Sequence, residues 1–346
     1  MRRELRVGVS GAGLMGQWHA HAARQAGAVV AAFADPDISA AQSSAQKYRA
    51  AALDDTAELL ATSDIAVLHV CSPTQTHSDV SALAMGQGTH VFIEKPVAQD
   101  QAQTWKVLQA AKQAKVQVCP AHQYAFQRSV ERIRDNLHKL NEITAIDLRF
   151  FSAGGLRTDT NALIQIAADI LPHPVSILQR LLPDRQIADL DWKLHSARPG
   201  EWMLVSSVDG IVLKISVGLL SRPTCVELTV VGTGGSFEAD LFHDYATWQN
   251  GMVSRTTKMT RPFTRSAGHF FSATGNLLAR AVRKEPAYPG LRALVSQFYD
   301  ACEQQTACPI SDVNMMDVAR FRDGFLQAAQ AGGDVLDMQP SLYSDL

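Results

Sequence analysis

The sequence is poor in cysteine and has no cluster that resembles a metal site. Its 346 residues include 5 cysteines, which are widely spaced and form no Cys-x-x-Cys pair. Neither a disulfide framework nor a structural zinc site is indicated. No group of histidine, cysteine and carboxylate residues has ligand spacing, so no metal is expected. Unpaired cysteines fit a reducing compartment, and we expect a cytoplasmic protein.

The chain also lacks an excess of charge and a long apolar run. It has 32 lysines and arginines against 34 aspartates and glutamates, which gives no overall field to hold nucleic acid or an anionic membrane. No stretch approaches the roughly 18 apolar residues of a membrane span. The expected partner is therefore a small molecule, with no nucleic acid and no membrane.

The length predicts two domains, and the pattern changes near residue 123. Before it, short apolar runs such as Val29–Ala34 alternate with helix-like stretches, which predicts a doubly wound parallel α/β domain over residues 1–123. Residues 124–346 predict an α+β domain with a largely antiparallel open sheet. Its strand candidates are Ile187–His195, Trp202–Val208, Ile211–Leu220 and Cys225–Val231.

A glycine motif follows the first apolar run. Gly11, Gly13 and Gly16 form Gly-x-Gly-x-x-Gly, with Leu14 and Met15 inside it. The first glycine allows a tight turn, the second lets the backbone approach a pyrophosphate, and the third lets helix and strand pack closely. The alternative is a glycine turn without a ligand.

Asp35 ends the second apolar run, 19 residues after Gly16. A carboxylate there can accept hydrogen bonds from both ribose hydroxyls, and it would repel a 2′-phosphate. NAD is therefore favoured over NADP, although Arg24 or Lys47 could still fold over a phosphate. The alternative is an aspartate that only caps a turn.

Glu94, Lys95 and Pro96 directly follow the apolar run Val91–Ile93. In a parallel sheet this is the carboxyl end of a strand, where such folds bind ligands. On position alone, Lys95 is either a cofactor-crevice residue or a surface lysine paired with Glu94.

Four segments together resemble the Gfo/Idh/MocA oxidoreductases, which include glucose-fructose oxidoreductase and inositol dehydrogenase. They are Gly11–Gly16 with His19, Asp35–Asp37, Cys71–His77 and Gly88–Pro96. The resemblance implies that Lys95 reaches the nicotinamide and the reacting hydroxyl. It also implies that Ser72, Pro73, His77 and Glu94 lie near the cofactor, and that the protein is a homodimer or homotetramer.

Members of this family carry an Asp-x-x-x-His pair, and Asp169 and His173 have that spacing here. The chemistry needs a base for the hydroxyl proton, and a nearby carboxylate can orient it. Pro172 and Pro174 break a helix, so we expect a helix to start near one of them, with Asp169 in the preceding turn. A helix cap and a core histidine are the alternatives.

Two further candidates lie near the expected domain junction. His122 and Tyr124 follow the last strand of the first domain and could contact substrate. The arginine that relatives have shortly after this point is missing, so substrate contacts cannot be copied across.

A basic stretch without acidic residues runs from Tyr245 to Lys284. We expect a solvated loop over Gly251–Ser266 and a helix near Leu277–Val282. A sharper hypothesis is that Arg255, Arg261 or Arg265 holds an anionic group of the substrate.

The resemblance implies an NAD-dependent oxidoreductase that transfers a hydride between nicotinamide and a secondary hydroxyl or ketone of a sugar, cyclitol or sugar derivative. One alternative is a redox-silent, NAD-dependent sugar lyase or glycosidase of the same family. The other is a dinucleotide-responsive binding protein without activity.

Overall fold

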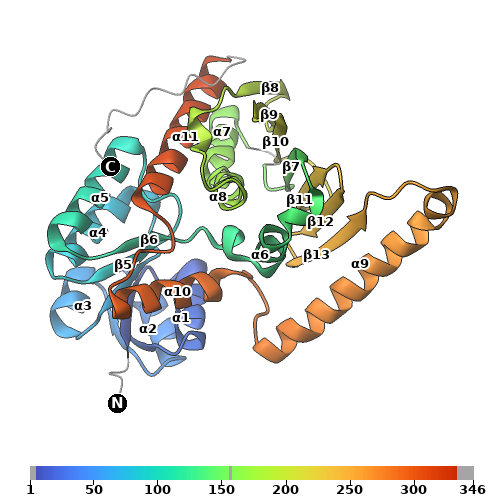
Figure 1. The fold of residues 1–346 in the computed structure, drawn as a ribbon. Helices are drawn as coiled ribbons and strands as arrows, with labels where there is room; N and C mark the ends of the chain where they lie inside the picture. The colour runs from blue at the N-terminus through green and yellow to red at the C-terminus, as the bar shows by residue number, and fades with distance from the viewer. Residues whose placement is uncertain (1–4, 156–157, 333–346) are drawn as a thin grey trace. The chain divides into compact units, whose positions relative to one another are not determined.

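The computed structural model describes residues 5–155 and 158–332. They form two compact units (Figure 1). Of the described residues, the first contains 5–123 and Leu291–Arg320, and the second contains 124–155, 158–290 and 321–332. Residues 291–320, which were predicted to belong to the second domain, pack with the first unit in the structure. No helix in the described ranges is long and apolar enough to cross a membrane.

The first unit is built on a six-stranded sheet with the order β3-β2-β1-β4-β5-β6. Every neighbouring pair is parallel, and apart from the edge strand β3 the strands are largely buried, which explains why their sequences are mostly apolar. The predicted doubly wound α/β fold is confirmed. The elements are β1 Arg6–Ser10, α1 Leu14–Gln25, β2 Val29–Ala34, α2 Ile38–Gln46, β3 Ala51–Leu53, α3 Thr56–Thr62, β4 Val67–Val70, α4 Thr74–Gly86, β5 His90–Ile93, α5 Gln101–Ala114, β6 Val118–Pro120 and α10 Leu291–Gln304.

Aspartate side chains start three of the helices in this unit. Asp37, Asp55 and Asp100 each accept a hydrogen bond from a backbone N–H in the first turn of α2, α3 and α5. Such caps satisfy N–H groups that have no partner inside the helix. They fix where the chain leaves each loop, and so they hold the carboxyl edge of the sheet in place.

The second unit is built on a seven-stranded sheet with the order β13-β12-β11-β7-β10-β9-β8. Only the pair β7 and β10 is parallel, and the other neighbours are antiparallel, as predicted. The elements are η1 Gln123–Phe126, α6 Arg128–Asp135, η2 Leu137–Leu140, β7 Ile143–Phe151, α7 Thr160–Ile170, α8 Pro172–Leu181, η3 Ile187–Asp189, β8 Lys193–Arg198, β9 Glu201–Val208, β10 Ile211–Gly218, β11 Cys225–Gly232, β12 Gly235–Asp240, β13 Tyr245–Asn250 and α9 Arg255–Arg283, while α11, Asp312–Ala331, continues into this unit.

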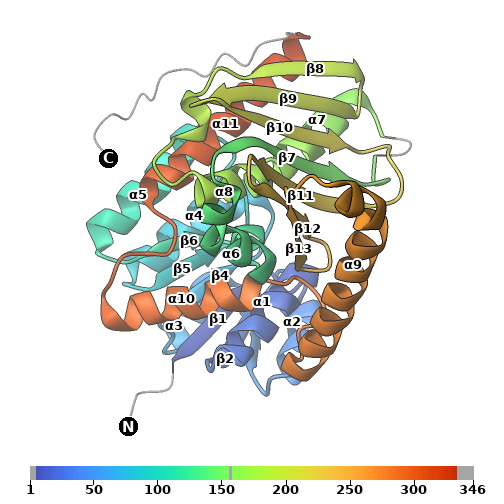
Figure 2. The ribbon, with the colours of Figure 1, turned by 45° about the vertical axis from the view of Figure 1, so that its right-hand side comes forward.

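One face of this sheet carries the core. In β9, Trp202 and Leu204 are buried, whereas Met203 between them is 38% exposed. Helices α7 and α11 lie behind the sheet in Figure 2, and Phe321 and Phe325 of α11 meet tryptophan rings edge to face. The alternation is that of an antiparallel sheet covered on one side.

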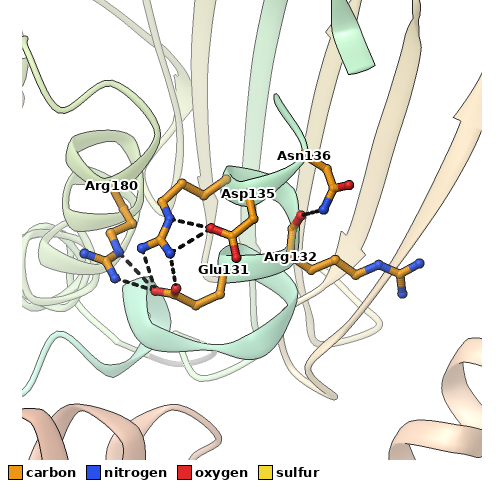
Figure 3. Close-up of polar contacts among 6 residues, drawn as sticks. Glu131, Arg132, Asp135, Asn136 and Arg180 are labelled. Atoms are coloured by element: carbon orange, nitrogen blue, oxygen red, sulfur yellow. Dashed lines mark hydrogen bonds and ion pairs between the residues drawn. The ribbon is translucent and has the colours of Figure 1, made fainter. Parts of the chain in front are cut away.

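Ion pairs form on α6 and reach α8. The carboxylate of Glu131 accepts from Arg134 and, across helices, from Arg180 (Figure 3). The guanidinium of Arg180 also lies 4.8 Å from the centre of the Phe126 ring. The ion pairs are partly exposed and worth about 1 kcal/mol at most. They connect α6 to α8, which carries His173 and whose residues are mostly buried by packing.

Two predicted elements of the second unit are wrong. The first is the strand over Ile187–His195, because the indole N–H of Trp192 donates to the carbonyl of Ile187 at 2.8 Å and turns the chain into η3 before β8 begins. The second is the loop over Gly251–Ser266, most of which belongs to the 29-residue helix α9. The Ser254 side chain caps α9, and the helix continues through an interior proline that ordinarily disfavours helix.

Candidate active site

The glycine loop has the geometry that its motif predicts. Gly11 has φ of +97°, and a Cβ there would lie 2.6 Å from the carbonyl carbon of Cys71. A Cβ at Gly16 would lie 1.9 Å from the carbonyl oxygen of Gly11. Both glycines are therefore required by the fold itself.

Gly13 differs, because a Cβ there would meet nothing within 4 Å. The protein's own packing does not require this glycine, so its open side fits the close approach of a ligand. Gly13 is also the N-cap of α1, which has neither a side-chain cap nor an acidic residue in its first turn. The first N–H groups of α1 are thus suited to a pyrophosphate, and the loop fits a dinucleotide.

Asp35 holds this loop in place. Its Oδ2 accepts from the N–H of Ala12 at 2.7 Å and its Oδ1 from the N–H of Asp37 at 2.9 Å. A carboxylate can accept about four hydrogen bonds, so ribose hydroxyls can still bind. The two cations that could offset its charge are engaged elsewhere: Lys47 donates to Gln17 at 2.8 Å, and Arg24 lies 4.8 Å from the centre of the Tyr48 ring.

Glu94 ends a buried chain of polar side chains. His19 Nε2 lies 2.9 Å from Glu94 Oε1, and His19 Nδ1 lies 3.2 Å from His69 Nδ1. The far nitrogen of His69, Nε2, lies 2.6 Å from the hydroxyl of Tyr299. On the other side, Glu94 Oε2 accepts from the N–H of Lys95 at 3.1 Å. We call the side chains of Glu94, His19, His69 and Tyr299 the buried relay.

With both rings neutral, one arrangement of protons satisfies the whole relay. A carboxylate only accepts, so His19 Nε2–H donates to Glu94 and His19 Nδ1 must accept. His69 therefore donates through Nδ1, and its Nε2 accepts from the hydroxyl of Tyr299. All donors point toward Glu94, and the relay joins α1, β4, β5 and α10 beneath Lys95.

The pKa shifts distinguish the two ends of the relay. Burial works to raise the pKa of Glu94, but the hydrogen bond from His19, the charge that His19 would carry if protonated, and the charge of Lys95 lower that pKa overall. Burial, and then His19, hold the pKa of His69 well below its usual value. Burial also raises the pKa of Tyr299 well above its ordinary range. Glu94 is thus the ionised member of a relay whose other end is neutral.

His77 fastens two loops of the site. Its Nδ1 lies 2.9 Å from the carbonyl oxygen of Pro96 and its Nε2 lies 2.8 Å from that of Ser72. Burial lowers the pKa of His77, although both carbonyls work in the opposite direction. The ring therefore connects the loop after β4, where Pro73 is the N-cap of α4, to the loop after β5.

His122 is buried beside Lys95, and neither ring nitrogen has a hydrogen-bond partner among the described residues. Burial, and then the charge of Lys95, lower the pKa of His122 to about 3. The ring is therefore neutral and offers one donor and one acceptor. A buried polar group with unused hydrogen bonds suits a ligand that brings its own polar atoms.

The second-domain candidates lie in the second unit. Asp169 is in the last turn of α7 and His173 is in the first turn of α8, with Leu171 between the helices. The predicted helix start at Pro172 is confirmed, but Asp169 is helical and does not lie in a turn. Its Oδ1 accepts from Arg322 at 3.1 Å.

His173 is buried between aromatic rings. The Tyr124 ring meets it edge to face at 4.6 Å, and the Phe150 ring is nearly parallel to it at 6.3 Å. Burial, followed by Tyr288 and Asp240, raises the pKa of Tyr124 to about 12, so its hydroxyl stays protonated. Two aromatic rings thus contact the imidazole.

The structure brings together the first-unit candidates. The segments that carry them follow the carboxyl ends of β1, β2, β4, β5 and β6, which are neighbours in the sheet, and this edge is where doubly wound folds bind ligands. These residues are Gly11, Gly13, Leu14, Met15, Gly16, Asp35, Ser72, Pro73, His77, Glu94, Lys95 and His122. Asp169, His173 and Tyr124 belong to the other unit.

Sequence reasoning missed the relay partners His69 and Tyr299. A histidine inside the otherwise apolar β4 was the available signal, because a buried polar side chain needs a partner. Nothing in the sequence could identify Tyr299 as that partner, since it lies 230 positions away. The arginines of the basic stretch have other contacts: Arg265 pairs with Glu238, and Arg261 donates to the carbonyl of Asn250.

Comparison with known proteins gives a family for the first unit. Residues 5–122 match the model of an oxidoreductase family with an NAD-binding Rossmann fold. Inositol 2-dehydrogenase 4 of Saccharopolyspora erythraea is 34% identical over 111 residues, which cover 31% of this chain and 33% of the relative. The NADP-dependent scyllo-inositol 2-dehydrogenase IolU of Bacillus subtilis is 30% identical over 100 residues, covering 29% and 30%. These matches span about a third of each relative.

A solved structure resembles nearly the whole chain. Levoglucosan dehydrogenase in complex with NADH and levoglucosan has a TM-score of 0.74, with 97% of this chain and 100% of that chain covered. Its sequence identity is 16%, so this likeness is evidence of a shared fold alone.

Proposed function

Because residues 5–122 belong to the Gfo/Idh/MocA family of NAD-binding oxidoreductases, we propose that this protein is a dehydrogenase acting on CH–OH groups. Its reaction transfers a hydride between nicotinamide and a secondary hydroxyl or ketone. The substrate is a sugar, a cyclitol or a sugar derivative, in keeping with the inositol dehydrogenases that the first unit resembles.

One observation carries the proposal. Lys95 lies at the carboxyl end of β5 with its backbone N–H bound to Glu94, which the buried relay keeps ionised. A merely structural lysine would not need a buried carboxylate and two buried histidines beneath it. An arrangement of this kind fixes the start of the Lys95 side chain beside a loop that fits a dinucleotide.

Four side chains of the candidate site have roles in the proposed reaction. Bound nicotinamide would supply the acceptor for the hydride. Lys95 stabilises negative charge on the reacting oxygen, since an ammonium group beside a developing alkoxide lowers its energy. His173 takes up the hydroxyl proton, and Asp169 balances the charge that the imidazole then carries. His122 offers hydrogen bonds to the bound ligands.

NAD is the proposed cofactor. The carboxylate of Asp35 is fixed by two backbone N–H groups at the end of β2 and opposes a 2′-phosphate. Lys47 donates to Gln17 and Arg24 lies over the Tyr48 ring, so neither side chain offsets the negative charge of Asp35.

The proposal is tested by titration calorimetry with NAD, NADH, NADP and NADPH, followed by an absorbance screen at about 340 nm over sugars, cyclitols and sugar nucleotides. We expect tight NAD binding and NADH formation with at least one substrate class. The Lys95→Ala variant should bind NAD normally and lose turnover, while Lys106→Ala on the exposed side of α5 is the matched control.

The outcomes separate the three functions. Absence of binding to any dinucleotide would overturn the cofactor assignment. Substrate conversion that depends on NAD but releases no NADH would identify the redox-silent lyase or glycosidase. NAD binding with no conversion of any compound would favour a binding protein.

A further inference from the structure

Helix α9 carries an apolar stripe that faces solvent. No residue of this helix is buried. At 3.6 residues per turn the apolar side chains fall within roughly 140° of the helix circumference. Each of them is 63–83% exposed, and they are Met259, Phe263, Phe270, Phe271, Leu277, Leu278 and Val282.

The polar side of α9, by contrast, lies against its own sheet. Arg265 and His269 contact the carboxylate of Glu238 on β12, and Arg280 donates to the carbonyl of His243. Figures 1 and 2 both show α9 beside the β13 end of the sheet. A surface helix ordinarily buries its apolar side, so this orientation leaves the stripe for something outside the unit.

The size of the stripe supports this reading. Side chains of this kind each offer roughly 150–200 Å² when exposed, so seven of them present on the order of 800 Å². The largest apolar patch on a typical monomer is about 300–600 Å², and larger ones mark protein or membrane contacts. The stripe is therefore a binding surface, and its charge decides between the two kinds of partner.

The segment that contains the stripe carries charge of one sign, although the carboxylates of Glu238 and Glu285 pair with Arg265 and Arg283. The segment Tyr245–Lys284 contains no aspartate or glutamate and seven basic residues, a formal charge of 7 − 0 = +7 in a chain whose net charge is −2. The basic residues are Arg255, Lys258, Arg261, Arg265, Arg280, Arg283 and Lys284. The balanced total charge, which predicted no membrane partner, conceals this local excess.

We propose that α9 binds the surface of an anionic lipid bilayer, lying in the plane of the interface with its apolar stripe among the acyl chains. Interfacial helices combine phenylalanine and leucine on one face with lysine and arginine on the other. Anionic headgroups attract each basic residue near the surface by about 1 kcal/mol. A second copy of this chain is the other occupant that the experiment below tests.

Flotation with lipid vesicles tests this proposal on the full-length protein. We expect binding to vesicles of equimolar phosphatidylglycerol and phosphatidylcholine, weaker binding in high salt, and little binding to phosphatidylcholine alone. The double variant Phe270→Ser/Leu277→Ser should reduce partitioning roughly tenfold or more. Because both side chains are at least 65% exposed, the fold should be unaffected.

The matched control is Met203→Ser/Val212→Ser on the open face of the second-unit sheet, where the two side chains are 38% and 49% exposed. It should bind vesicles like the wild type. Binding that the control reduces equally, or that neutral vesicles match, would overturn the assignment. A second copy would be shown to cover the stripe by two results together. The wild type would not bind anionic vesicles, and the α9 double variant would have a lower molar mass by light scattering than the wild type.

Discussion

The two units hold their candidate histidines in different ways. In the first unit, the rings of His19 and His69 belong to a continuous set of hydrogen bonds that ends on an ionised glutamate. In the second unit, the His173 ring packs against Tyr124 and Phe150. The hydrogen bonds of the relay fix both the position and the protonation of its rings, whereas contacts with aromatic rings restrict the position of an imidazole and do not determine its protonation.

This difference suggests a division of labour. The first unit provides fixed charges, with Glu94 ionised and Lys95 attached to it through the backbone. The second unit provides the group whose protonation changes during a reaction cycle. If the comparison is right, substitutions in the two units should affect different measurable quantities.

The largest effect is expected at His173. The His173→Asn variant should lower kcat/KM by about 10³–10⁴, because proton transfer loses its base. NAD affinity should not change, since the residues that fit the dinucleotide belong to the other unit. Steady-state kinetics and calorimetry check both expectations. With Ser176→Ala on the same helix as the control, a loss of less than tenfold for His173→Asn would remove it from the proposed chemistry.

The next largest effect is expected at Lys95. Replacing it by methionine retains an apolar stem and removes the ammonium, and kcat/KM should fall by about 10²–10³. The pH profile of the remaining activity should keep its shape, because the proton is exchanged elsewhere. Lys95→Arg retains the charge and should recover part of the loss. If Lys95→Met changed only KM, the lysine would serve binding and not the reacting oxygen.

The buried relay should matter first for stability. Tyr299→Phe removes the hydroxyl that lies 2.6 Å from His69 Nε2 and leaves a buried ring nitrogen without its donor. A cost of about 2 kcal/mol is expected, measured as a lower midpoint of unfolding in urea. Tyr245→Phe, at a partly exposed strand position, should change the midpoint little. If both variants changed the midpoint equally, the hydrogen bond between Tyr299 and His69 would contribute no more to stability than a partly exposed tyrosine hydroxyl.

His122 should make the first unit sensitive to acid. Its pKa is about 3 in the folded protein against an ordinary 6.5, so the unfolded chain takes up the proton first. Its contribution is intact above pH 6.5 and is lost as the pH falls toward 3. At pH 5 the loss is about 2 kcal/mol.

Between pH 7 and pH 5 the free energy of unfolding should therefore fall by about 2 kcal/mol less in the His122→Asn variant than in the wild type. Urea unfolding at both pH values measures this. His243→Asn, at a side chain that is 62% exposed, should leave the difference unchanged. Parallel curves for wild type and His122→Asn would contradict the neutral buried ring.

The first unit could be predicted from the sequence because its determinants are local. A Cβ at Gly11 or Gly16 would meet backbone atoms that lie within or next to the sheet. The Asp35 carboxylate accepts a hydrogen bond from Ala12 in the glycine loop. The pattern of short apolar strands was sufficient to give the sheet. What could not be predicted is the pairing of His69 with Tyr299, since a contact across 230 positions leaves no periodic pattern.

The second unit was harder to predict for a physical reason. Its sheet has one open face, so the spacing of apolar residues in the sequence distinguishes strands from helices less clearly in this unit. The bond from Trp192 to a carbonyl five residues before it delays the predicted strand, so that β8 begins only at Lys193. The helix predicted near Leu277–Val282 is the C-terminal part of α9, and the rest of α9 was missed because it buries nothing and contains Pro262, Gly268 and Gly275, all of which disfavour helix.

The smallest expected effect concerns Asp35, where the structural and functional readings of one residue can be separated. Its carboxylate supports the glycine loop through the N–H of Ala12 and, in the proposed complex, also opposes a 2′-phosphate. Asp35→Asn keeps one acceptor oxygen, which can take the N–H of Ala12, and removes the charge, so the preference for NAD over NADP should narrow by about tenfold, or 1.4 kcal/mol, while NAD affinity changes little. If NAD and NADP affinities fell together, support of the loop would be the main function of Asp35, and cofactor choice would have to come from another residue.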